Sequence, residues 1–359
     1  MYKRILLHGA TNCGSSNYGD FLYGYIVYQF FEQKKMNVEF YQPSAFFMEY
    51  IENYNNIIKF KKNKADLIVY IPGGYFGEGH KAKLKENIMQ FLRFMPLGIW
   101  ASCKKKPIIV MGIGAGPINN IFMKLAIKRI CNNAKFVTTR DNISYKELKK
   151  ICPKANIIEC GDLILTKKWN ENKIKTGQIN KIAGLNKKII LVHYNHDKEA
   201  LKKFAEALNI FINNNKDYFV VVSADSILEN EEEYYNEFKK IFKHRSEHFV
   251  YNNPFEMTEL LKLSNVVLTC KLHIGVVSAL YEKSVIAAAC HPEKTMRFYE
   301  QINESNRCIE LEKIEPYQLA NLLEKYKEKR INIKAEVVDK ANKTWKILED
   351  FLGDENEKR

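Results

Sequence analysis

The sequence of 359 residues lacks several features that would place it in a class at once. Its eight cysteines are scattered and contain no C-x-x-C pair, a pattern typical of reduced, mostly buried thiols in a cytoplasmic protein. No apolar run approaches the length of a transmembrane helix, and the run before His8 is too short for a secretory signal. We therefore expect a soluble cytoplasmic protein rather than a secreted or membrane-spanning one.

Acidic residues are too few to balance the cations. Lys and Arg total 56 against 42 Asp and Glu, which gives a formal net charge of +14. Such an excess favours an anionic partner. A nucleic acid is not expected, because the sequence has neither a basic stripe with interleaved aromatics nor a recognisable binding module. A small anion, a lipid-linked glycan or the phospholipid at the inner face of the plasma membrane would use the same charge. The oligomeric state is left open.

Short apolar runs alternate with longer amphipathic segments along most of the chain. Strands are predicted at 4–8, 38–41, 67–71, 108–111, 136–138, 156–159, 189–193, 218–223, 248–251, 266–269, 284–288 and 308–311. Helices are predicted at 20–33, 82–103, 122–131, 143–150, 198–213, 230–243, 254–263, 274–281, 294–302, 316–326 and 334–351. This alternation predicts the α/β class, with parallel sheets covered by helices on both faces.

The alternation breaks between 166 and 188, a stretch rich in Lys, Asn and Gly that we interpret as a linker. It separates an N-terminal domain at 1–165 from a C-terminal domain at 189–330. A final helix with a frayed polar tail is expected at 331–359. The predicted architecture is two doubly wound, Rossmann-like domains that face each other across a cleft, with the ligands between them.

The triplet Lys271-Leu272-His273 is the most informative part of the C-terminal domain. It follows one apolar run and precedes another, so it falls where a buried strand ends and a helix begins. Ligands of open α/β sheets bind at such strand ends, and a helix N-terminus presents backbone N–H groups to anions. A structural role is the common fate of a lone histidine. Beside Lys271, however, His273 is our candidate for proton transfer to an anionic substrate.

The first strand-to-helix loop contains Asn17, Gly19 and Asp20, residue types that suit unusual backbone angles and a helix cap. Asp20 either caps the helix or acts on a substrate. The glycines at 9, 14 and 19 do not have G-x-G-x-x-G spacing, so a dinucleotide site is not expected.

Two glycine-rich segments follow successive strands. Gly73 and Gly74 lie in the first, and Gly112, Gly114 and Gly116 lie in the second. Glycines at strand ends let the backbone approach a ligand closely, although a plain tight turn is the alternative. Together with the first loop, they predict a ligand crevice.

Another junction carries Arg140, Asp141 and Ser144. Asp141 can cap the next helix with Ser144 in its first turn. Arg140 then stands at the strand tip, either available to a carboxylate or phosphate or paired with a nearby acidic group. Lys294 lies in the first turn of a later helix, where a bound anion would offset its unfavourable position against the helix dipole. Solvation of Lys294 is the alternative.

A metal site is not supported by the sequence. His193 and His196 are spaced by one helical turn, but His193 ends a strand, so a shared face is doubtful. The chain has no carboxylate pair of the metal–nucleotide type and no P-loop lysine.

These junctions, taken in order, resemble the polysaccharide pyruvyltransferase family over roughly residues 5 to 300. The elements of the resemblance are the first loop (Asn17, Gly19, Asp20), the glycine segments (Gly73, Gly74 and Gly112, Gly114, Gly116, Pro117), the R-D-x-x-S helix start (Arg140, Asp141, Ser144), a G-D pair (Gly161, Asp162), the basic-x-His triplet and Lys294. The sequence departs from the family pattern at Lys271, where arginine is usual, and in the first glycine segment, which lacks a third glycine. The resemblance implies a GT-B-like fold.

It also implies a function. The expected reaction transfers pyruvate from phosphoenolpyruvate to sugar hydroxyls as a cyclic ketal, on a cell-surface or secreted polysaccharide or its lipid-linked precursor. Phosphoenolpyruvate is then a co-substrate, and no cofactor is expected. The implied catalytic residues are His273 as general acid and Asp20 as base or orienting group. The implied substrate-binding residues are Arg140, Lys271, Lys294, Asn17, Gly73, Gly74, Gly114 and Ser144.

Three alternatives remain at this point. A nucleotide-sugar-dependent glycosyltransferase of the same architecture would need a sugar nucleotide and ignore phosphoenolpyruvate. A catalytically silent relative would bind a glycan or an anion without turnover, and the lysine at position 271 is its best support. A basic nucleic-acid binder would show steeply salt-dependent binding.

Overall fold

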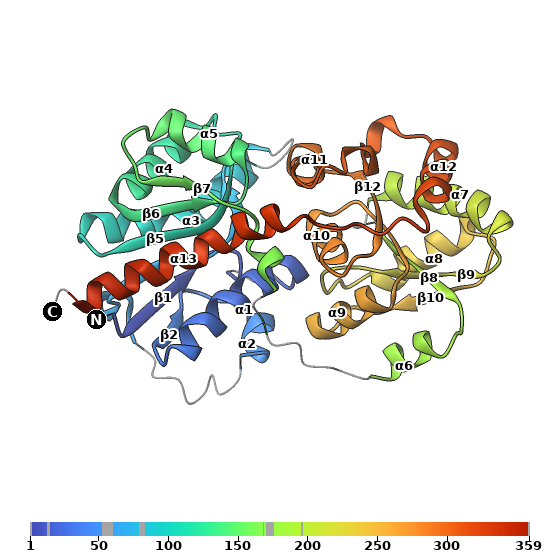
Figure 1. Cartoon of the computed structure of the whole chain (residues 1–359), viewed down its shortest axis with the longest axis horizontal. Coiled ribbons are helices and arrows are strands. Elements are labelled where there is room, and N and C mark those ends of the chain that lie inside the picture. The colour runs from blue at the N-terminus through green and yellow to red at the C-terminus, as the bar shows by residue number, and fades with distance from the viewer. Residues whose placement is uncertain are drawn as a thin grey trace. The chain divides into compact units, whose positions relative to one another are not determined.

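The computed structural model describes residues 2–12, 15–51, 60–78, 83–167, 169, 176–194 and 197–357. The chain divides into two compact units, each built around its own parallel sheet (Figure 1). Unit 1 comprises Met1–Ser16, Asp20–Trp169 and Ala335–Arg359, and unit 2 comprises Asn17–Gly19 and Asn170–Lys334.

The sheet of unit 1 has the strand order β2-β1-β3-β5-β6-β7, and β4 pairs with β5 beside this path. Its strands are β1 (Arg4–His8), β2 (Asn37–Phe40), β3 (Leu67–Tyr70), β4 (Gly73–Phe76), β5 (Ile108–Ala115), β6 (Ala134–Thr139) and β7 (Ile157–Glu159). The helices of the same unit are α1 (Tyr18–Gln33), α2 (Ala45–Glu49), α3 (Leu84–Cys103), α4 (Ile121–Asn133), α5 (Asn142–Ile151) and α13 (Ala335–Glu357), with the first two residues of α1 belonging to unit 2. The central strands β3 and β5 are buried along their whole length, as expected for a parallel sheet covered on both faces.

The sheet of unit 2 has the strand order β10-β9-β8-β11-β12-β13, and all neighbours are parallel. Its strands are β8 (Lys188–His193), β9 (Tyr218–Ser223), β10 (Ser246–Phe249), β11 (Val266–Thr269), β12 (Ser284–Ala289) and β13 (Cys308–Glu310). The helices are α6 (Gly177–Ala183), α7 (Lys198–Asn214), α8 (Glu231–Ile241), α9 (Pro254–Leu263), α10 (Leu272–Leu280), α11 (Pro292–Gln301) and α12 (Pro316–Tyr326).

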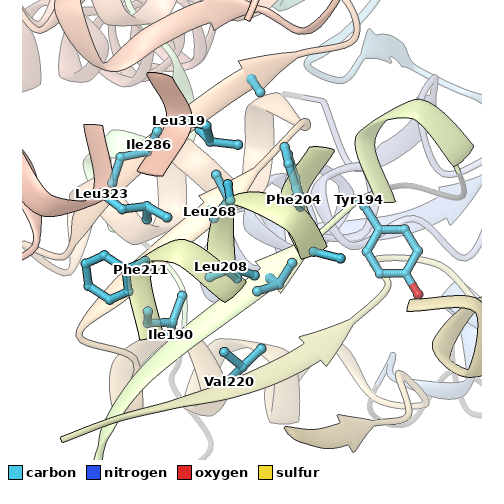
Figure 2. Packing of buried hydrophobic residues seen from close by; sticks show 14 of the residues in the cluster. Ile190, Tyr194, Phe204, Leu208, Phe211, Val220, Leu268, Ile286, Leu319 and Leu323 are labelled. Carbon is cyan, nitrogen blue, oxygen red and sulfur yellow. The ribbon is translucent and has the colours of Figure 1, made fainter. Parts of the chain in front are cut away.

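One face of the unit 2 sheet forms a continuous hydrophobic core with α7 and α12. Figure 2 shows Leu208 from α7 and Leu323 from α12 over the strand residues Ile190, Leu268 and Ile286, all of them buried. Alternate strand residues face this layer because successive side chains of a strand point to opposite faces. The remaining alternate residues, such as Val267, are also buried, so both faces of the sheet are covered.

The α/β class and the two doubly wound domains predicted from the sequence are therefore confirmed. Each apolar run that was predicted to be a strand is one in the structure, with small differences at the ends. The domain boundaries stay a prediction. Part of the predicted linker at 166–188 lies outside the described residues, and α6 falls within it.

Three local predictions were wrong. The segment with Gly73 and Gly74 was predicted to follow a strand as a glycine-rich loop but itself forms strand β4, because it pairs with the far end of β5. For the same reason β5 continues through Gly114 to Ala115 instead of ending at Met111. The frayed tail is also wrong, since α13 continues to Glu357. Among the described residues, no helix is long and apolar enough to cross a membrane.

Candidate functional site

A cluster of polar side chains lies at the carboxyl ends of the central strands of unit 2. His193 ends β8, Thr269 ends β11, and Asp225 follows β9 by two residues. These strands are neighbours in the order β9-β8-β11, so their tips meet at one edge of the sheet. That edge is where open α/β sheets bind their ligands.

Asp225 is the centre of this cluster. Its side chain is 4% exposed, and its Oδ1 lies 3.3 Å from His193 Nε2 and 3.7 Å from Lys271 Nζ. Its Oδ2 accepts a hydrogen bond of 2.7 Å from Asn17 Nδ2. Burial by itself raises the pKa of Asp225, but Lys271, His193 and Asn17 together lower it below the ordinary value. Asp225 is therefore an ionised carboxylate that holds three groups in place.

Thr269 connects the tip of β11 to its neighbours. Its hydroxyl oxygen accepts a hydrogen bond of 3.0 Å from the backbone N–H of Lys271 and lies 3.4 Å from His193 Nδ1. Both ring nitrogens of His193 thus face polar groups of this cluster. These contacts fix the turn between β11 and α10, and with it the direction in which Lys271 leaves the strand.

Helix α10 begins directly after this turn, with Lys271 at its N-cap and His273 in its first turn. The N-cap has no side-chain hydrogen bond to the helix backbone. The first N–H groups of a helix have no intrahelical partner, so this end suits an anion. The lysine and histidine of the triplet are thereby placed together at the predicted strand-to-helix junction.

His273 packs against the backbone of Gly19. A Cβ added to Gly19 would lie 1.8 Å from His273 Nδ1 and 2.2 Å from its Cγ, closer than real Cβ atoms come. Only glycine therefore allows the imidazole to occupy this position. This close approach explains a glycine that the sequence could only interpret as a loop residue.

Asn17 anchors the loop that carries Gly19. Besides its bond to Asp225, Asn17 accepts a hydrogen bond of 3.0 Å from the N–H of Gly19 through Oδ1. The N–H of Tyr18 donates to the carbonyl of Asp225 (2.8 Å), and the Tyr18 hydroxyl lies 2.7 Å from Thr258 Oγ1. The segment Asn17–Gly19 is thus an integral part of unit 2.

Asp20 follows this segment and belongs to unit 1. Its Oδ2 accepts a hydrogen bond of 3.1 Å from Ser15 Oγ. Helix α1 begins at Tyr18, so Asp20 lies within its first turn. The N-cap position that the sequence suggested for Asp20 is occupied instead by Asn17, because Asn17 already binds the N–H of Gly19.

Arg140 lies at the tip of β6 in unit 1 and is only 6% exposed. Its Nε is 3.5 Å from Asp141 Oδ2, and Asp162 and Tyr23 also act on its charge. Burial lowers the pKa of Arg140, but Tyr23, Asp141 and Asp162 raise it above the ordinary value. Of the two alternatives that the sequence left open, Arg140 is therefore the one paired with a nearby acidic group.

Gly114 and Ser144 lie beside Arg140. A Cβ on Gly114 would be 2.7 Å from Arg140 Cζ, so the guanidinium lies against the backbone of β5. Ser144 is fully buried, and its Oγ accepts a hydrogen bond of 2.9 Å from the N–H of Ala115. Asp141 Oδ1 accepts from the N–H of Ser144 (2.7 Å), which confirms the predicted helix cap.

The other predicted site residues have more local surroundings. Gly73 is buried in β4, where an added Cβ would be 2.6 Å from the ring of Tyr75. Gly74 is its half-buried neighbour in the same strand. Lys294 is half-buried in the first turn of α11, after β12. The structure brings Asn17, Lys271 and His273 together in unit 2, and Gly114, Arg140 and Ser144 together in unit 1.

The sequence interpretation missed Asp225 and the role of His193. The predicted site does not include Asp225, and the sequence suggested His193 only as a possible metal ligand. The available signal was position, because Asp225 directly follows the apolar strand β9 in the same way that Lys271 follows β11. The partner suggested for His193, His196, lies outside the described residues. Within the described ranges, no three His, Cys, Asp or Glu residues are grouped to hold a metal.

Unit 2 has a cavity of about 590 Å³, and the first residue that lines it, Ile227, follows Asp225 by two positions in the chain. Its polar wall includes the carboxylates of Glu229, Glu231 and Glu232. The volume suits a small ligand. The three carboxylates, however, would repel an anion, so an anionic substrate fits the Lys271 end of the sheet better.

Solved structures with the same fold span nearly the whole chain. The S. aureus MnaA–UDP co-structure is 14% identical, covers 98% of this chain and 97% of its own, and gives a TM-score of 0.64. The UDP-GlcNAc 2-epimerase from Neisseria meningitidis bound to UDP-GlcNAc is 12% identical, with coverages of 98% and 99% and a TM-score of 0.62. Anabaena HepE in complex with UDP and glucose is 13% identical, with coverages of 98% and 100% and a TM-score of 0.52. These likenesses show the fold alone.

None of the curated proteins compared with the chain matches it in sequence. A family match does exist, to the family described as polysaccharide pyruvyl transferase, over residues 17–292. The matched range begins at the Asn17 loop, includes Arg140, Lys271 and His273, and ends just before Lys294. It covers well over half of the chain, and it confirms the resemblance seen in the order of the motifs. The chain therefore belongs to the polysaccharide pyruvyl transferase family.

Proposed function

We propose that the protein transfers pyruvate from phosphoenolpyruvate to two hydroxyls of a sugar as a cyclic ketal. The acceptor would be a cell-surface or secreted polysaccharide or its lipid-linked precursor. The observation that carries the proposal is the packing of His273 against Gly19 beside Lys271, at the start of α10, in a chain of this family. A proton donor and a cation next to a helix N-terminus are what this donor requires.

The negative charge of the donor is the reason why cationic residues are proposed to bind it. Phosphoenolpyruvate carries a carboxylate and a phosphate, so cations and backbone N–H groups must replace their water. Lys271 and the first turn of α10 supply both in unit 2. Lys271 is a compact cation without the fork of arginine, so we propose that it contacts one oxygen at a time. Lys294 would add a second cation.

The predicted site residues of unit 1 would have another role than those of unit 2. Arg140 is buried and paired with Asp141, and its guanidinium rests on Gly114. We propose that it organises the ends of β5 and β6 together with Ser144, and that any contact with substrate is made through the backbone of these ends. Gly73 and Gly74 lie in β4, next to β5, and we propose that their lack of side chains keeps this strand free of bulky groups.

The chemistry assigns His273 the role of general acid. A proton from the imidazolium goes to the methylene carbon of phosphoenolpyruvate and leaves an oxocarbenium-like centre at C2. A sugar hydroxyl adds to C2 and loses its proton, the C2–O bond to phosphate breaks, and a second hydroxyl closes the ring. The products are the ketal and inorganic phosphate. General acid catalysis of this kind contributes about 10²–10⁴ in rate.

Asp20 is the proposed base for the acceptor. It follows Gly19 directly and binds Ser15 in the present structure. A carboxylate can orient a sugar hydroxyl and take its proton as the C–O bond forms. The reaction balances with phosphoenolpyruvate alone, so we propose no cofactor. Because the donor is a cytoplasmic metabolite, we place the reaction in the cytoplasm.

The test is phosphate release from phosphoenolpyruvate in the presence of a panel of sugar acceptors. His273→Ala should lower kcat by about 10²-fold or more, whereas Lys271→Ala should mainly raise KM for phosphoenolpyruvate. His244→Ala and Lys239→Ala, elsewhere in unit 2, are matched controls that should keep wild-type turnover. Turnover that is unchanged in His273→Ala would remove the assignment of the general acid.

A sugar-nucleotide-dependent glycosyl transfer is the alternative to be tested in parallel. Several structural neighbours were solved with UDP or UDP-GlcNAc bound. Calorimetric titration and the phosphate-release assay together separate the two functions. The proposal expects phosphoenolpyruvate to bind in the titration and UDP-GlcNAc to have no effect on turnover in the assay. Binding of phosphoenolpyruvate without phosphate release on any acceptor would instead identify a silent anion-binding relative.

A further inference from the structure

Unit 1 carries an exposed apolar surface on two neighbouring helices. Seven large apolar side chains there are between 49% and 69% exposed: Leu84, Ile88, Met89 and Leu92 of α3, and Ile121, Phe122 and Leu125 of α4. We call these seven residues the α3–α4 patch. Among the described residues of unit 2, by contrast, the large exposed apolar side chains are few and scattered, for example Ile227 and Tyr317. Large exposed apolar side chains gathered on neighbouring helices are typical of an interaction site.

The two helical stripes lie on helices that pack on each other. Leu84, Ile88 and Leu92 are spaced by four residues and so share a face of α3, and Ile121 and Leu125 do the same on α4. Both helices connect parallel strands, so they run in the same direction, and they pack on each other. Figure 1 shows α3 and α4 in the same part of unit 1.

The register of the two helices brings the stripes to the same height. Gly98 of α3 meets Ile130 of α4, where an added Cβ would be 2.7 Å from the Ile130 side chain. Leu92 precedes Gly98 by the same number of residues as Lys124 precedes Ile130. Leu92 therefore lies near the level of Lys124 and Leu125, although Pro96 stands between Leu92 and Gly98 in α3.

The charges carried by α3, α4 and the segment between them are mostly positive, and the carboxylate of Glu78 lies at the start of α4, where it accepts hydrogen bonds from the N–H groups of Asn119 and Asn120. Between residues 83 and 135 the chain has ten Lys or Arg residues and one acidic residue, Glu86. Helix α4 has no acidic residue, and its exposed Lys124, Lys128 and Arg129 border the apolar stripe. The occupant of the patch must therefore be both apolar and anionic.

We propose that the α3–α4 patch docks the protein on an anionic phospholipid bilayer. Large apolar side chains bordered by Lys and Arg are the composition of surfaces that lie in the headgroup region. A second copy of the chain fits poorly, because an isologous pairing would bring the cations of the two patches against each other. Docking would hold the protein where a lipid-linked glycan is presented, but it involves no chemistry and stands apart from pyruvyl transfer.

The test is co-sedimentation of the full-length protein with vesicles. Binding to phosphatidylglycerol and phosphatidylcholine in equal parts should exceed binding to phosphatidylcholine alone by about tenfold or more, and added salt should weaken it. Leu92→Gln with Phe122→Gln should lower the partition coefficient by about tenfold, and Lys124→Glu with Lys128→Glu should have a similar effect. All four positions are exposed, so the fold and the circular dichroism spectrum should be unchanged.

Matched variants in unit 2 are the controls. Ile227→Gln with Tyr317→Gln, and Lys239→Glu with Lys240→Glu, should bind vesicles like the wild type. The proposal is overturned if the wild type does not bind anionic vesicles, or if the patch and control variants lose binding equally. A patch that mediates dimerisation without vesicle binding, measured by sedimentation velocity, would overturn it in favour of a second copy. Transfer to a water-soluble acceptor by the patch variants reports separately on the catalytic proposal.

Discussion

At the scale of single residues, the position of His273 depends on the absence of a side chain at Gly19. The imidazole of His273 occupies the space that a Cβ at position 19 would need, so Gly19 is required for packing. The sequence showed a glycine in a loop and a histidine far away in the chain, and nothing in it connected the two. The family pattern contains both residues, but their contact is a product of the fold.

Gly19→Ala should displace the His273 ring and, if His273 is the general acid as proposed, lower kcat for phosphate release by about 10²-fold or more. Steady-state kinetics with phosphoenolpyruvate and an acceptor measure the effect. Gly177→Ala is the matched control, since no atom lies within 4 Å of a Cβ added there. Equal activity of Gly19→Ala and Gly177→Ala would contradict the packing argument.

A second residue-scale prediction concerns His8 at the tip of β1. Its Nε2 donates to the carbonyl of Phe94 (3.0 Å), and its Nδ1 accepts from Asn12 Nδ2 (2.8 Å). Complete burial lowers the pKa of His8 from 6.5 to about 4. Between these values the unfolded imidazole binds more protons than the folded one, so stability falls as the pH is lowered through this window.

The free energy of unfolding of the wild type should therefore decrease by about 3 kcal/mol more than that of His8→Gln between pH 6.5 and pH 4. Glutamine keeps a donor for Phe94 and does not titrate. Denaturant unfolding curves at both pH values give the two differences. Parallel pH dependence in the two proteins would exclude His8 as the cause.

At the scale of elements, α13 shows how a distant segment completes unit 1. Trp345 of α13 is 1% exposed, stacks on Phe30 at 4.9 Å, and donates its indole N–H to Thr166 (3.1 Å). The backbone of Ala341 comes so close to Gly161 that an added Cβ there would meet it at 2.9 Å. The G-D pair of the family pattern thus has a structural task on its glycine side.

Trp345→Ala should reduce the free energy of unfolding of unit 1 by about 3–5 kcal/mol, because it removes a large buried ring and a buried hydrogen bond. Hydrogen exchange resolved by residue measures the loss at β1 and α1. Trp100→Ala, a half-buried tryptophan of the same unit, is the control and should cost less. A smaller loss for Trp345 than for Trp100 would argue against the packing of α13.

Elements that show a clear period were predictable, and those created by pairing were not. Strands such as β9 and β11 are apolar runs between turn signals, so the sequence identified them. Strand β4 begins with two glycines and exists because Ile113 and Ala115 of β5 offer it a partner. Helix α6 is short and lies in a polar stretch, so it carried no periodic signal.

At the scale of the whole molecule, each unit has a core of its own. The core of unit 2 contains Phe204, Leu208 and Leu323, all fully buried (Figure 2). The short segment Asn17–Gly19 belongs to this unit although the rest of α1 belongs to unit 1. The contact between Gly19 and His273 therefore lies within unit 2, which includes this short segment from the N-terminal part of the chain.

Phe204→Ala should remove about 3–5 kcal/mol from the unfolding free energy of unit 2, through a cavity between α7 and the sheet. Hydrogen exchange should show the loss of protection in β8, β9 and α7 and leave β3 and β5 of unit 1 protected. A uniform loss over both units would show that the two cores do not unfold separately.

The sequence by itself determined the α/β class, the succession of strands and helices, and the junctions where polar residues collect. It could do so because hydrophobic period and turn chemistry are local properties. Only the tertiary structure decided which junctions meet. It brought Asp225 beside Asn17, His193 and Lys271, buried Arg140 among acidic partners, and laid His273 on Gly19. Apart from the pair Arg140–Asp141, these are contacts between residues far apart in the chain, and their pairing follows from the order of strands in a sheet, which no local pattern encodes.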